Sequence, residues 1–96
     1  MEQMERIAYM EKILDEAKTA VTSLSEALEK YAAVVKNLEE LEAYYDGEQW
    51  RQDFDDDSAG KIPTELKRGF LSEDAVYDLL MDNRELKERL RKFAAQ

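Results

Sequence analysis

Residues 44–77 read YYDGEQWRQDFDDDSAGKIPTELKRGFLSEDAVY and stand between two segments whose apolar residues recur with helical spacing. This stretch contains all three glycines and the only proline of the chain. Because these residues interrupt helices, we expect a connector of short helical turns between two longer helices. The stretch also contains six of the nine aromatic residues, namely Tyr44, Tyr45, Trp50, Phe54, Phe70 and Tyr77.

The segment before the connector carries one uninterrupted helical pattern from about Glu2 to Tyr45. No glycine or proline precedes Gly47, so a single helix of roughly 60 Å is predicted. With Ile7 at heptad position a, the stripe formed by positions a, d and g is wider than the seam of a two-stranded coiled coil and predicts at least two neighbouring helices. Its members are Ile7, Leu14, Val21, Leu28 and Val35 (a), Met10, Ala17, Leu24, Tyr31, Leu38 and Tyr45 (d), and Ile13, Ala20, Ala27, Val34 and Leu41 (g).

The connector begins where Asp46 and Gly47 break this helix. Gly47 suits a left-handed helix end, while Asp46 with Gln49 could instead open a new helix through a capping box. Trp50 and Phe54 are four residues apart, so a short helix places both rings on one face. We expect these two rings to be largely buried against the end of the long helix.

The rest of the connector is expected to alternate between turns and extended chain. The run Asp55–Gly60 ends the short helix, and Lys61–Pro63 reads as extended. A further turn covers Thr64–Arg68 and is closed by Gly69.

The final helix is predicted to start at Ser72 as N-cap, with Glu73 and Asp74 in its first turn and Leu71 packing on Val76. Asn83 falls within the apolar stripe, either as a solvated or partly buried amide or as a buried amide that fixes helix register. The stripe is Val76, Leu79, Asn83, Leu86, Leu90 and Phe93, with Leu80 alongside.

The pattern predicts an all-α fold and a single domain, residues 1–96. Its parts are a long amphipathic helix (1–46), the connector (47–71) and a second, antiparallel helix (72–96). A last helix of roughly 35 Å can cover only part of a first helix of roughly 60 Å. We therefore expect a homodimer or higher oligomer with coiled-coil character, in which two chains form a helical bundle.

Composition narrows the classes of function. The 23 acidic and 14 basic residues give a net charge of −9, which disfavours nucleic acid and anionic membranes as partners. The chain has neither cysteine nor histidine, so disulfides, thiolate chemistry and the commonest general base are excluded. The first residues are acidic and lack an apolar run, so we expect no signal peptide and a cytoplasmic location.

Several motifs resemble one family of short bacterial proteins, described only as a domain of unknown function, number four-two-nine-eight. The resemblance covers nearly the whole chain and implies a small, helical, cytoplasmic bacterial protein; it supplies no activity, ligand or catalytic residue. Phe70 stands where a smaller aliphatic residue is expected. The motifs are Tyr44-Tyr45, Trp50-Arg51-x-Asp53-Phe54, Asp57-x-x-Gly60-x-Ile62-Pro63, Leu66-Lys67-Arg68-Gly69, Leu71-Ser72-Glu73-Asp74-Ala75-Val76-Tyr77 and Asn83-Arg84-Glu85-Leu86.

Acidic residues raise two alternatives that involve a metal. Asp53, Asp55 and Asp57 match the first three ligand positions of an EF-hand loop, but Ser58 and Thr64 replace its glycine and its closing glutamate. We therefore expect a solvated acidic loop, paired with Lys61, Lys67 or Arg68, and neither metal nor cofactor.

The helical carboxylates point to the other alternative, a Mg²⁺-dependent all-α hydrolase of the nucleotide pyrophosphohydrolase type. Glu39 and Glu42 have the Glu-x-x-Glu spacing of such enzymes, but no Glu-x-x-Asp pair follows in the right place. Solvated helix faces are the favoured interpretation of Glu39, Glu40, Glu42, Asp74, Asp78 and Asp82.

The favoured function is that of a non-enzymatic, self-associating module that presents its connector to a protein partner. Trp and Tyr dominate binding hot spots, although an aromatic cluster more often packs a long loop onto its own helix. The candidate interaction residues are Ile7, Met10, Ile13, Leu14, Tyr44, Tyr45, Trp50, Phe54 and Phe70.

Overall fold

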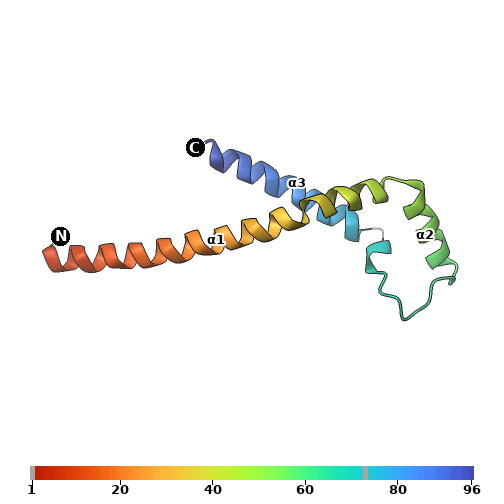
Figure 1. The fold of residues 1–96 in the computed structure, drawn as a ribbon, viewed down its shortest axis with the longest axis horizontal. Helices are drawn as coiled ribbons and strands as arrows, with labels where there is room; N and C mark the ends of the chain where they lie inside the picture. Colours follow the sequence, from red (N-terminus) through yellow and green to blue (C-terminus); the bar gives the residue numbers. More distant parts are fainter. Residues whose placement is uncertain (1, 73) are drawn as a thin grey trace. The chain divides into compact units, whose positions relative to one another are not determined.

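The computed structural model describes residues 2–72 and 74–96, and every regular element in them is helical (Figure 1). The expected order of a long helix, a helical connector and a shorter helix is confirmed. The elements are α1 (Gln3–Tyr45), α2 (Glu48–Ser58), the 3₁₀ helix η1 (Gly69–Leu71) and α3 (Ala75–Ala94). By their internal contacts the residues form two units, one reaching to Val35 and the other spanning Lys36–Gln96, which are described separately.

The first unit consists of the N-terminal part of α1, which has no buried residue. The apolar heptad residues from Ile7 to Leu28 are exposed, while Tyr31 and Val35 are half-buried. Ile7 and Met10 are each 55% exposed, and Val21 is 68% exposed. The helix therefore forms as its periodicity predicts, but the part of its apolar stripe from Ile7 to Leu28 is exposed.

In the second unit, Gly47 ends α1 differently from the left-handed cap that its sequence position favours. Its φ is −100° and its ψ 174°, so it adopts extended backbone and serves as the N-cap of α2. Glycine is favoured at this position because there is little room for a side chain: a Cβ atom would lie 3.3 Å from the carbonyl oxygen of Ala43. A second helix does restart at this break, but Gly47 is its N-cap and no side chain caps it, so the predicted capping box of Asp46 and Gln49 is wrong.

The left-handed residue of the connector is Gly60, at the other end of α2. Its φ is +76°, and its amide donates to the carbonyl oxygen of Asp57 at 3.1 Å. The amide of Lys61 donates to the carbonyl oxygen of Asp56 at 2.9 Å. These two hydrogen bonds form a Schellman motif, which stops α2 after Ser58. The acidic run is thus helical through Asp57 and does not form a loop.

The entry to α3 follows the sequence pattern. Ser72 has extended backbone, and its Oγ accepts a hydrogen bond from the amide of Ala75 at 3.1 Å. The hydrogen bond spans three residues, as an N-cap side chain does, but it reaches the first residue of α3, whose N-cap is Asp74. Glu73, expected in the first turn, lies outside the described residues. Gly69, expected to close a turn, instead begins η1.

The core of the second unit is small. Among the described residues only Leu71, Val76 and Leu80 are buried, at 4%, 2% and 8% exposure. They come from η1 and from the first turns of α3, which pack against each other. Leu71 and Val76 thus flank the Ser72–Ala75 hydrogen bond and are both buried, as a hydrophobic staple would be.

The buried face of α3 is rotated from the predicted stripe. Leu80 is buried and Asn83 half-buried, whereas Leu79 is 45% exposed and Phe93 is 71% exposed. Leu79, Leu86 and Phe93 follow one another at seven-residue spacing and form an exposed strip beside the buried face. The prediction that these three residues belong to the core is wrong for the single chain.

Candidate functional site

An aromatic cluster joins α1, α2 and η1. The ring of Trp50 meets that of Tyr45 edge-on, with centroids 5.0 Å apart, and stacks on Phe54 at 5.1 Å. Tyr44, on the last turn of α1, contacts Phe70 at 5.9 Å. The sequence prediction placed Trp50 and Phe54 largely out of water, but both are half-buried. A helix of 11 residues supplies too little surface to enclose two large rings.

A hydrogen bond fixes the contact between α1 and α2. The hydroxyl of Tyr44 donates to Oδ2 of Asp53 at 2.5 Å. Burial raises the pKa of Tyr44 to about 12, and the hydrogen bond to Asp53 and the negative charge of that carboxylate act in the same direction. Asp53 therefore orients a neutral tyrosine across the helix junction.

The acidic run makes separate contacts and does not form a shared site. Asp57 forms an ion pair with Arg68, whose Nη1 also donates to the carbonyl oxygen of Pro63 at 2.8 Å. Asp56 lies 4.0 Å from Lys61, and Asp55 is exposed. The expected pairing of this run with Lys61 and Arg68 is confirmed, and these contacts fold the loop 59–68 back on α2.

No three acidic side chains in residues 2–72 and 74–96 come together as metal ligands. Asp53 and Asp57 share one face of α2, since they are four residues apart, but they contact different partners. Asp55 points from the opposite face. The carboxylates that a Mg²⁺-dependent hydrolase would use are not gathered either. Glu42 pairs with Arg84, and it belongs to no group of three acidic side chains in the described part of the chain.

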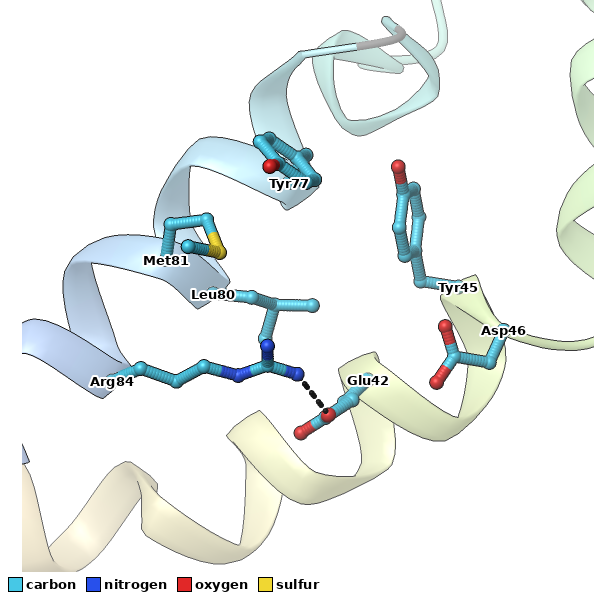
Figure 2. A pocket seen from close by; sticks show the side chains of 7 residues that line it. All are labelled: Glu42, Tyr45, Asp46, Tyr77, Leu80, Met81 and Arg84. Atoms are coloured by element: carbon cyan, nitrogen blue, oxygen red, sulfur yellow. Dashed lines mark hydrogen bonds and ion pairs between the residues drawn. The ribbon is translucent and has the colours of Figure 1, made fainter.

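A groove of about 210 Å³ lies between the end of α1 and the start of α3, both within the second unit (Figure 2). Leu80 is buried at its base, and Arg84 Nη2 lies 3.3 Å from Oε1 of Glu42 (Figure 2). Because Tyr45 and Tyr77 line one end and Glu42 and Arg84 the other, the two helices run antiparallel here. The lining residues are Glu42, Tyr45, Asp46, Tyr77, Leu80, Met81 and Arg84.

Sequence reasoning did not identify this groove. Tyr45 was an interaction candidate, and Glu42 was considered only as a metal ligand. Asp46 was interpreted as a helix breaker, and no role was given to Met81 or Arg84. The signal that could have found the groove is the antiparallel return of α3, which brings Glu42 opposite a basic residue 42 positions later.

Four of the remaining interaction candidates lie on the first unit. Ile7, Met10, Ile13 and Leu14 are all exposed. They occupy successive a, d and g positions, so they form one continuous apolar surface on α1. Phe70, in the connector, is 40% exposed and adds an apolar edge to the aromatic cluster.

These features define a small all-helical protein with an exposed heptad surface, an aromatic helix junction and a shallow acidic groove. Residues 7–93 match the family model described as a domain of unknown function, DUF4298, and the chain belongs to that family. The resemblance drawn from the connector motifs is thereby confirmed. No curated protein and no solved structure matches the chain. Among the described residues, no helix is long and apolar enough to cross a membrane.

Proposed function

We propose that this protein is a non-enzymatic, self-associating helical module that presents its connector to a protein partner. The observation that carries the proposal is the exposed apolar surface of α1. The helix has 43 residues, and none of them is buried. Soluble proteins rarely leave an apolar strip of this length in water, and such strips mark interaction sites.

The lengths of the two helices support this proposal. The helix α1 has 43 residues and α3 has 20. Because every helical residue adds the same rise, a helix as long as α3 can match less than half of α1. The exposed strip from Ile7 to Leu24 therefore offers a surface for a second chain. A second copy supplies an identical strip and gives closed two-fold symmetry.

The connector is the surface that such an assembly would present. Tyr44, Tyr45, Trp50, Phe54 and Phe70 gather half-exposed rings at one helix junction. Half-exposed aromatic side chains on a hydrogen-bonded scaffold lose little conformational entropy on binding, which favours them as contact residues.

Two matched variants test the self-association. Replacing Ile7 and Leu14 with serine removes two a positions of the strip, whereas replacing Lys12 and Thr19 with serine changes two outward-facing f positions of the same turns. Light scattering at micromolar concentration should show that the first variant loses the oligomer and the second retains it. If both variants have the same mass as the parent chain, the strip of α1 is not the contact surface.

A further inference from the structure

We propose that the groove between the end of α1 and the start of α3 binds an arginine side chain of a partner polypeptide. The inference goes beyond self-association, because it names the chemistry of a ligand and a site that lies within one chain. It rests on the walls of the groove, on its carboxylates and on the charge of the chain.

The walls of the groove are two tyrosine rings from different helices. Tyr45 projects from the last turn of α1 and Tyr77 from the first turn of α3, and open space separates them (Figure 2). Tyr77 is 53% exposed, so its ring is available to a ligand. A planar guanidinium stacks on aromatic faces and is attracted by their negative quadrupole. The volume of about 210 Å³ is sufficient for one side chain but not for a helix.

The carboxylates stand on one edge of the groove. Glu42 and Asp46 are four residues apart, so they project from the same side of α1. None of the ion pairs within residues 2–72 and 74–96 involves Asp46, which leaves its carboxylate available for a bidentate contact with a guanidinium.

The groove already holds one guanidinium of its own. Arg84 contacts a single oxygen of Glu42 at 3.3 Å, with the two side chains 66% and 43% exposed. An exposed ion pair of this kind is weak, so a ligand can share or displace it.

Charge and chemistry select arginine over other ligands. The net charge of −9 attracts cations and repels anions. Ca²⁺ and Mg²⁺ gain nothing from aromatic and aliphatic walls, and two carboxylates would leave most of their coordination shell to water. A lysine ammonium is a point charge without the planar surface that stacks between rings.

Trp50 is a built-in reporter, because its ring lies 5.0 Å from Tyr45. The probe is an acetylated tri-arginine amide, and the control peptide replaces each arginine with neutral citrulline. Calorimetric titration, with Trp50 fluorescence followed in parallel, should show saturable binding of the arginine peptide alone. Asp46→Asn and Tyr77→Leu should each weaken binding at least fivefold, with helix content checked by circular dichroism.

The matched control is Asp55→Asn, which removes the same charge from an exposed position of α2 that does not line the groove. It should change the affinity less than twofold. Any of three results would overturn the proposal. Asp46→Asn and Asp55→Asn could weaken binding equally, or the citrulline peptide could bind as tightly as the arginine peptide. The arginine peptide could also give neither heat nor a fluorescence change up to about 10 mM. The variant with serine at positions 7 and 14 should bind the arginine peptide as tightly as the parent does. A failure of self-association would therefore leave this proposal standing, and the reverse holds as well.

Discussion

At the scale of single residues, Trp50 is the centre of the aromatic junction. Its ring contacts both Tyr45 and Phe54, while its Nε1 atom is buried without a hydrogen-bond partner. The ring contacts stabilise the junction, and the unpaired N–H opposes part of that gain. The indole therefore contributes through its apolar surface and not through its polar atom.

Two substitutions at Trp50 separate these contributions. Trp50→Ala should lower the free energy of unfolding by about 2–3 kcal/mol, less than the ~3–5 kcal/mol of a fully buried ring because Trp50 is half-buried. Trp50→Phe should cost less than about 1 kcal/mol, since it keeps most of the ring contact and removes the unpaired donor. Urea unfolding followed by circular dichroism measures both. A Trp50→Ala variant as stable as the parent would show that the cluster does not stabilise the fold.

Tyr44 makes the stability of the second unit sensitive to alkaline pH. Its pKa is raised to about 12 in the folded chain, against about 10 for an unfolded tyrosine. The protonated hydroxyl is thus favoured by folding. Its stabilising contribution is complete below pH 10 and is lost as the pH rises toward 12.

Tyr44→Phe isolates this effect. The variant should be about 1–2 kcal/mol less stable than the parent below pH 10, because the hydrogen bond to Asp53 is lost. The difference should shrink between pH 10 and pH 12, since the other four tyrosines are common to both chains and cancel. Thermal unfolding across this range measures it, and a difference that does not change with pH would contradict the role of the Tyr44 proton.

Asp53, Asp55 and Asp57 carry a further prediction about metals. Calorimetric titration with Ca²⁺, Mg²⁺ and Mn²⁺ should reveal no site tighter than millimolar, because these side chains make separate contacts along a helix. A micromolar, one-to-one isotherm that Asp55→Asn or Asp57→Asn abolishes would contradict this and favour the hydrolase alternative.

At the scale of elements, the start of α3 depends on one side chain. The Oγ atom of Ser72 accepts the amide hydrogen of Ala75, and the cap holds Leu71 and Val76 in the small core. Ser72→Ala should therefore cost about 1 kcal/mol, and Ser72→Asp should keep the stability of the parent. Thermal unfolding tests the pair against Ser25→Ala, an exposed position in the middle of α1. Equal melting temperatures for Ser72→Ala and the parent would show that the cap is not required.

The elements that could be predicted are those with a local cause. The uninterrupted heptads of α1 and the Ser72 cap depend on neighbours in sequence, and the structure contains both. The left-handed helix end could not be located, because both Gly47 and Gly60 can adopt a positive φ and only Gly60 does so. The rotated face of α3 was missed because tertiary packing, here with η1, decides which side of α3 is buried.

The groove illustrates the same limit. The groove is lined by residues from two distant parts of the sequence, Tyr45 and Asp46 on one side and Tyr77 and Arg84 on the other. The antiparallel return of α3 makes them neighbours. Periodicity indicates which faces are apolar but not which residues of two helices stand opposite each other. Sequence reasoning therefore recognised the aromatic cluster and not the groove beside it.

At the scale of the whole molecule, two apolar surfaces remain without a partner in the described residues of a single chain. One is the a, d and g stripe of α1 from Ile7 to Leu28, and the other is the strip of Leu79, Leu86 and Phe93 on α3. A core of three buried residues is small for a chain of 96. Association with a second copy would bury both surfaces and enlarge the core, as in helical bundles.

The mass of the native protein in solution tests this central claim most directly. Size-exclusion chromatography with light scattering should report at least twice the chain mass of 11.2 kDa at micromolar concentration. If association is weak, the mass should fall on dilution. The helix content measured by circular dichroism should then fall as well, because an isolated helix without tertiary contacts is only marginally stable. A homogeneous species of 11.2 kDa at all concentrations, with unchanged helix content, would contradict self-association through α1.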